Sequence, residues 1–189
     1  MNDESLNEES IFPEADIVYS KFWDRFGALL LDGCIVLALT LPASYFNVTV
    51  WKIPSLYVLI GLVTIFYKPV MECRFGATLG KMIVGLLVVG RDFEKVTISE
   101  ELKRVSFYLF PAILQHIITL PLYFSTAFDT INNYKEFNQQ VSVSNPSLLW
   151  INGIVFVLFI ADTVAFFVNQ PNRALHDVYA GTNVIVRKR

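Results

Sequence analysis

Long apolar runs alternate with shorter polar segments along the chain. Four of these runs are long enough to cross a membrane: residues 26–46, 53–72, 106–124 and 148–168. A helix rises about 1.5 Å per residue, so about 20 residues span a bilayer core about 30 Å thick. The pattern predicts an all-α membrane protein with four transmembrane helices. The first two helices should form an antiparallel hairpin, because only the short turn 47–52 connects them.

Two segments outside these runs predict a small additional layer. Residues 74–89 are apolar but too short, and too often interrupted by glycine, to cross the membrane. They predict an interfacial amphipathic segment lying on the membrane, followed by a strand at 86–89. Residues 172–182 predict a short helix stopped by Gly181, with a second strand at 183–186. The two strands could pair in a small cytoplasmic cap.

The remaining segments are polar. Residues 1–20 contain acidic side chains but no Lys or Arg and predict a disordered tail, which leaves residues 21–189 as one membrane domain. Thr97 and Glu100 have the spacing of a capping box and predict the start of a helix that soon enters the membrane. Residues 127–147 predict a polar loop. The sequence shows no internal repeat.

Composition and charge agree with an integral membrane protein. Charged residues make up 17% of the chain and hydrophobic residues 54%, whereas soluble domains carry about 25% charged residues. The net charge of −2 gives no indication of a nucleic-acid partner. With four spans, only Lys52 and Lys135 of the 15 Lys and Arg residues fall on one side of the membrane. The positive-inside rule therefore predicts a multi-pass protein of the cell membrane with both termini cytoplasmic.

Several ionisable residues lie within the predicted spans, at similar depth in one leaflet. Asp32 lies about six residues from the cytoplasmic end of the first run and Asp162 a similar distance from that end of the fourth. Lys68 and Glu72 lie close to the cytoplasmic end of the second run. Isolated charges at this depth are costly, so we expect these groups to converge, either in pairs or around a small hydrated vestibule. The alternative is a structural network that fixes the register of the helices.

Three further groups are candidates for the same network. His116, in the middle of the third run, could relay protons or form a hydrogen bond between helices. Lys81 could face lipid phosphates or an acidic partner such as Asp32 or Asp177. Arg173 and Asp177 are four residues apart, a spacing at which two side chains can pair on a helix.

Motifs for catalysis or cofactor binding are missing from the sequence. Cys34 and Cys73 have no spacing that suggests a disulfide framework or a metal site, and both are predicted to be structural thiols. There is no activated nucleophile, no second histidine at ligand spacing from His176, and no complete phosphate-binding loop. The sequence therefore predicts no catalytic residues, no metal and no cofactor, and we do not expect an enzyme.

Three blocks of the chain resemble the RDD family of membrane proteins, named for one arginine and two aspartates. The blocks are residues 25–32, 72–89 and 173–182. The most specific signals are the stretch Gly76-Ala-Thr-Leu-Gly-Lys81 and the Ala-Gly-Thr ending of the third block. The resemblance implies that Arg25 and Asp32 are the name-giving residues of the first helix and that Asp177 is the second aspartate. It also implies transport of an undefined ligand, with sodium/proton exchange in some members. The chain departs from the family in its long outer loop and in the added Asp162.

Two functional hypotheses follow. The first is a small cation/proton antiporter or other secondary transporter, in which Asp32 alternates between a proton and a monovalent cation, assisted by Asp162 or His116. One subunit of four spans is small for alternating access, so this hypothesis predicts a homo-oligomer in contact with membrane lipids. The second is a non-transporting scaffold or accessory subunit, in which the buried charges set the helix register.

Overall fold

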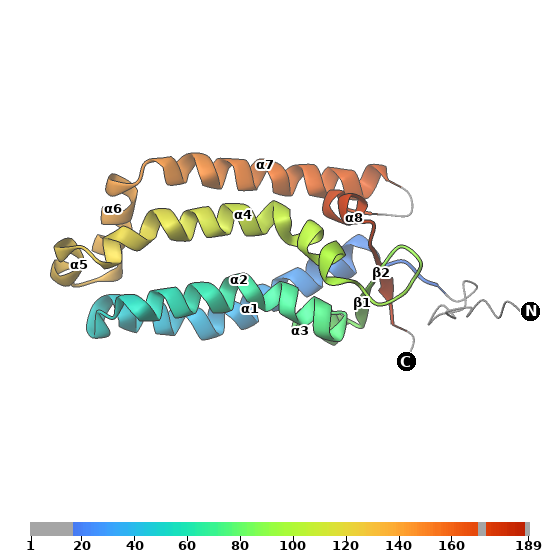
Figure 1. Cartoon of the computed structure of the whole chain (residues 1–189), viewed down its shortest axis with the longest axis horizontal. Helices are drawn as coiled ribbons and strands as arrows, with labels where there is room; N and C mark the ends of the chain where they lie inside the picture. The colour runs from blue at the N-terminus through green and yellow to red at the C-terminus, as the bar shows by residue number, and fades with distance from the viewer. Residues whose placement is uncertain (1–16, 170–172, 188–189) are drawn as a thin grey trace, which may run out of the picture.

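The computed structural model describes residues 17–169 and 173–187. Four long helices, each apolar enough to cross a membrane, run the length of the molecule in alternating directions (Figure 1). They are α1 (Phe22–Phe46), α2 (Pro54–Phe75), α4 (Ile98–Tyr123) and α7 (Ser147–Val168). The prediction of an all-α membrane fold with four transmembrane helices is confirmed. The predicted disordered tail, residues 1–20, lies mostly outside the described residues.

A small cap covers the end of the bundle at which both described ends of the chain meet (Figure 1). In it β1 (Leu86–Val89) pairs antiparallel with β2 (Asn183–Val186). The short helices α3 (Leu79–Val84) and α8 (Leu175–Ala180) precede the two strands. Each short helix ends at a glycine in the left-handed region, with φ of 80° at Gly85 and 74° after α8, a conformation that glycine adopts without steric cost. Both predicted strands and the predicted short helix are present.

The order of elements repeats in the two halves of the chain, although the sequence shows no repeat. The first half runs from the hairpin α1–α2 through α3 and a glycine to β1, and the second from α4 and α7 through α8 and a glycine to β2. The short helix α3 packs against α1, and α8 packs against α4 and α7. The repeat escapes sequence inspection because it lies in the order of the elements and not in matching residues at matching positions.

The connection between α1 and α2 is helical rather than an irregular turn. Residues Asn47–Trp51 continue α1 as a π-helix, labelled η2. The helix ends at Lys52, which has a φ of 52° and donates its backbone N–H to the carbonyl oxygen of Asn47. The Asn47 side chain accepts the backbone N–H of Ile53 over 2.9 Å, so one residue organises both sides of the connection.

The capping box at the start of α4 forms as predicted. Thr97 accepts the backbone N–H of Glu100 on its hydroxyl and donates its own backbone N–H to the Glu100 carboxylate, over 2.8 Å. The helix therefore begins at Ile98 and continues without interruption into the predicted span 106–124. This early start places the first turns of α4 inside the cap.

The segment 127–147 is not a loop, which corrects the prediction. It contains most of α5 (Thr126–Thr130) and all of α6 (Tyr134–Ser144). Asn133 caps α6 by accepting the backbone N–H of Glu136 over 2.9 Å. The sequence of this segment predicts a loop because most of its side chains are polar. The helix α6 is short and buries only a narrow apolar face. That face joins a cluster at the end of the bundle opposite the cap, formed by Val48, Leu122, Tyr123, Phe128, Ile131 and Phe137.

Candidate functional site

Asp32 lies on α1 and accepts hydrogen bonds from three uncharged groups. The hydroxyl of Tyr67 on α2 donates over 2.8 Å, the backbone N–H of Gly80 donates over 2.7 Å, and the Thr78 hydroxyl donates to the second carboxylate oxygen. Thr78 precedes α3 and Gly80 is its second residue. The carboxylate therefore lies at the amino end of α3, where unpaired backbone N–H groups stabilise a negative charge. Among the described residues, no basic side chain forms an ion pair with Asp32.

The contact between α3 and α1 depends on a glycine. A Cβ atom at Gly80 would lie 2.8 Å from the carboxyl carbon of Asp32 and closer still to the carbonyl oxygen of Ala28. A Cβ atom does not approach other heavy atoms this closely, so a side chain at this position would force the two helices apart. The close approach brings the Gly80 N–H within hydrogen-bonding reach of Asp32.

Asp162 on α7 makes a similar set of contacts in the second half, but the two long helices exchange roles: Asp32 lies on the first long helix of its half and Asp162 on the second. It accepts the hydroxyl of Tyr108 on α4 over 2.9 Å and the backbone N–H of His176 over 3.1 Å. His176 is the second residue of α8, just as Gly80 is the second residue of α3. Both halves therefore combine an aspartate from one long helix, a tyrosine from the other and the second backbone N–H of the short helix.

The second site differs from the first because it continues into charged groups. The His176 imidazole places Nδ1 2.7 Å from Asp162 and Nε2 3.2 Å from Asp177. Asp177 is fully buried; Arg25 donates to one of its carboxylate oxygens, and Nε of Arg104 lies 3.1 Å from the other. Burial alone would raise the pKa of Asp177, but His176, Arg104 and Arg25 together hold this pKa well below its usual value.

Arg104 connects Asp177 to charged residues of α2 and α3. Its side chain is 1% exposed, and NH1 lies 2.8 Å from the fully buried Glu72. The ammonium group of Lys81 donates to the other Glu72 oxygen over 2.8 Å. Burial and the nearby Arg104 lower the pKa of Lys81 to about 8, although Glu72 favours the charged form. Glu101, on the same helix, lies 4.0 Å from Arg104. We call the connected set the charged network: Arg25, Glu72, Lys81, Glu101, Arg104, Asp162, His176 and Asp177.

Other sequence candidates lie at the edge of the network or outside it. Lys68 places its ammonium group 5.3 Å from the centre of the Tyr108 ring. Arg173 precedes α8 and donates to the backbone carbonyl of Asp177, not to its carboxylate. The His116 ring stacks on Tyr57 of α2, and its Nδ1 lies 2.8 Å from a carbonyl oxygen of its own helix. His116 therefore packs at the interface between α2 and α4.

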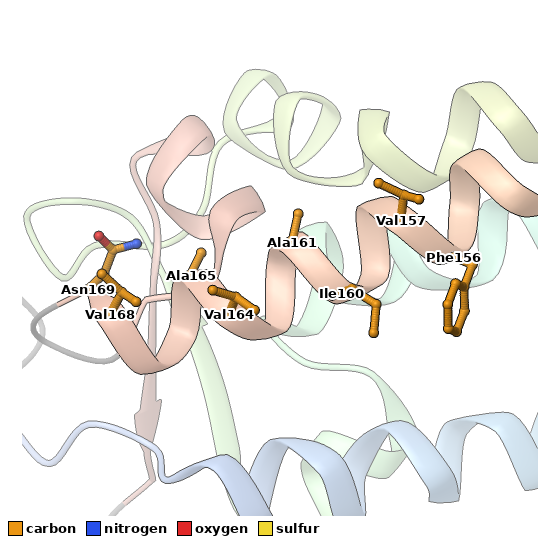
Figure 2. A pocket seen from close by; sticks show the side chains of 8 residues that line it. All are labelled: Phe156, Val157, Ile160, Ala161, Val164, Ala165, Val168 and Asn169. Atoms are coloured by element: carbon orange, nitrogen blue, oxygen red, sulfur yellow. The ribbon is translucent and has the colours of Figure 1, made fainter.

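An apolar hollow lies along one side of α7 (Figure 2). None of its lining residues is ionisable. They are Phe156, Val157, Ile160, Ala161, Val164, Ala165, Val168 and Asn169. Apart from Asn169 at one end, this surface is apolar and suits contact with lipid acyl chains.

Comparison with known protein families identifies the family of this chain. The family model described as RDD family matches residues 19–181. The chain belongs to the RDD family. It is thus a multi-pass integral membrane protein. No curated protein and no solved structure matched the chain significantly.

In this RDD protein the three residues identified from the family resemblance occupy two different places. Arg25 and Asp177 form an ion pair inside the charged network. Asp32 lies apart from it, among the uncharged donors Tyr67, Thr78 and Gly80, a group that we call the neutral site. Glu72 and Asp162 share the network with Arg25 and Asp177. Lys81 pairs with Glu72, not with Asp32 or Asp177 as the sequence suggested.

Sequence reasoning missed several residues that complete the two sites. Arg104 and Glu101 follow the capping box by only a few residues, which made them look like ordinary cytoplasmic charges. Tyr67 and Tyr108 lie in apolar runs and resemble membrane-interface aromatics. The one signal in the sequence was that His176 and Asp177 are adjacent. It was set aside because no second histidine lies at the spacing of a metal site.

Proposed function

We propose that this RDD protein is a small secondary transporter that exchanges protons for monovalent cations. The observation that supports it is the repetition of one arrangement in two halves: an intramembrane aspartate at the amino end of a short helix, with a tyrosine from the neighbouring span. In secondary transporters, interrupted helices at corresponding positions of two repeats commonly form the binding site. This RDD protein has short helices at corresponding positions.

The two aspartates are assigned different tasks. Asp32 is held by neutral donors, so an incoming cation would compete only with hydrogen bonds and not with an arginine or lysine. Asp162 contacts His176, whose two ring nitrogens face two carboxylates. An imidazole can take a proton from a neighbouring carboxylic acid and release it again. We therefore assign cation binding to Asp32 and proton transfer to Asp162 and His176, while the ionised Asp177 holds the imidazole in place.

Orientation and assembly complete the proposal. We place the cap and both termini in the cytoplasm of a cell-membrane protein, because the Lys and Arg residues concentrate at the cap end of the predicted topology. We also propose a homo-oligomer, because four spans per subunit leave little room for a closed pathway. Cysteine accessibility at Lys135 and Arg91, on opposite ends, tests the orientation, and the mass of the detergent-solubilised particle tests the assembly.

The decisive experiment is proton flux in proteoliposomes on addition of sodium, potassium or lithium. We expect flux with the wild type, loss of cation-dependent flux in Asp32→Asn, and loss of proton movement in His176→Gln. Asp129→Asn, an exposed residue of α5, serves as the matched control and should behave as the wild type. Absence of flux from a folded wild type with all three cations would contradict transport.

A second candidate function rests on the burial of Arg104. This side chain joins Glu72 of α2 to Asp177 of the cap and thereby fastens three elements together. Such a contact suits a scaffold or accessory subunit whose charges set the helix register. A scaffold would show no flux in the experiment above, and exchanging the charges of Arg25 and Asp177 would restore folding lost in either single variant.

A further inference from the structure

Glu101 is the one member of the charged network whose carboxylate has no donor in the part of the chain that the structure describes. Its side chain is fully buried in the first turns of α4. Neither oxygen accepts a hydrogen bond, and the nearest cation is NH1 of Arg104, at 4.0 Å. Glu72, equally buried, has both Arg104 and Lys81 at 2.8 Å. The two glutamates therefore differ in pairing, not in burial.

An ionised carboxylate without donors is costly in a buried site, and protonation removes that cost. The charged groups that face Glu101 from the neighbouring helices are Glu72 and Lys68 of α2 and Lys81 of α3, besides Arg104 of its own helix. The negative charge of Glu72 disfavours ionisation of Glu101, whereas the three basic groups favour it. Glu101 thus lies among charges of both signs without a hydrogen-bond donor of its own.

We propose that Glu101 is the site at which the charged network takes up and releases a proton. The inference rests on the proposed proton-coupled function and names a residue for its cytoplasmic step. In the neutral form Glu101 leaves Arg104 with Glu72 and Asp177. When the proton leaves, the carboxylate attracts Arg104, which weakens the contact of Arg104 with Asp177. Because Asp177 contacts His176, the change reaches the Asp162 site through two contacts.

The test is infrared titration of the purified, full-length protein in proteoliposomes. At pH 7 the wild type should show the C=O stretching band of a protonated carboxylic acid, which disappears as the pH rises. The band should be absent from Glu101→Gln and retained in Glu94→Gln, an exposed control in the loop that follows β1. Labelling glutamate with carbon-13 should shift the band in the unsubstituted protein, which identifies a glutamate even if the variant fails to fold.

Transport measurements then separate this inference from the proposed function. If the band belongs to Glu101 but no cation drives proton flux, the proton site stands and the transport proposal fails. If flux occurs and its pH dependence is the same in Glu101→Gln as in the wild type, the proton site is wrong. A band that persists in Glu101→Gln, or a wild type with no such band at pH 7, also overturns the inference.

Discussion

The sites of Asp32 and Asp162 have the same plan but different surroundings. In each, a carboxylate accepts a tyrosine hydroxyl and the second backbone N–H of a short helix. The third partner of Asp32 is the Thr78 hydroxyl, whereas that of Asp162 is the His176 imidazole. The first site is therefore complete within neutral groups. The second is connected through His176 to the charged network.

A single position accounts for much of this difference. At the second residue of α3 the chain has Gly80, where a side chain would collide with α1. At the second residue of α8 it has His176, whose ring is the link to Asp177. Similar backbone geometry thus supports a site closed by neutral donors in one half and a site linked to charged groups in the other. The comparison shows that a structural repeat need not imply equal chemistry.

The largest expected effect is a greater loss of stability when a carboxylate is removed from the charged network than when one is removed from the neutral site. Asp177→Asn leaves Arg25 and Arg104 without their shared carboxylate, and removing one partner of a buried ion pair costs about 3–5 kcal/mol. We expect the free energy of unfolding to fall by that amount, measured in detergent micelles. Asp32→Asn, which removes only hydrogen bonds from neutral donors, should cost about 1–3 kcal/mol. Equal losses in the two variants would contradict the comparison.

Acid should weaken the charged site through the same residue. Burial raises the pKa of Asp177, but His176, Arg104 and Arg25 hold it well below the usual 3.8. As the pH falls below that value, the unfolded chain binds the proton before the folded one, so the contribution of Asp177 to stability is lost. We expect the melting temperature of the wild type to drop in this range and that of Asp177→Asn to change less. A parallel drop in both proteins would rule out Asp177 as the cause.

The neutral site should be sensitive to side-chain size at Gly80. Gly80→Ala forces α3 away from α1, and overpacking of this kind costs about 1–3 kcal/mol. Gly153→Ala on α7 is the control, because a Cβ there meets nothing within 4 Å. Thermal unfolding in micelles measures both. If Gly80→Ala were as stable as the control, the close contact between α1 and α3 would be wrong.

The smallest expected effects come from the two tyrosines. Tyr67→Phe and Tyr108→Phe each remove one hydrogen bond to a carboxylate, at a cost of about 1.5 kcal/mol, the low end for a hydrogen bond to a charged group. Tyr108→Phe should in addition lower proton flux, because Asp162 then contacts His176 without a second side-chain donor. Tyr67→Phe should instead weaken the attachment of α3, whose first residue, Leu79, donates its backbone N–H to the Tyr67 hydroxyl, and should alter the cation dependence of the flux through Asp32. If Tyr67→Phe lowered proton transfer and Tyr108→Phe did not, the roles assigned to the two sites would have to be exchanged.

Local patterns made some elements predictable. The four apolar runs, the capping box at Thr97 and Glu100, and the two strands each follow from residues close together in sequence, because helix length and capping depend on neighbours. The helices in segment 127–147 were missed because α6 depends on a few apolar contacts with distant residues such as Val48 and Tyr123. Their stability comes from tertiary packing, which the local pattern does not report.

The sequence by itself determined that this is a four-span membrane protein of the RDD family and that charged residues lie within membrane depth. Only the tertiary structure decided which charge meets which: Lys81 with Glu72, Arg25 with Asp177, and Asp32 with neutral donors. The reason is physical. Hydrophobic run lengths are set by bilayer thickness and can be read along the chain, whereas ion pairs form between side chains brought together by helix packing, up to 152 residues apart in sequence.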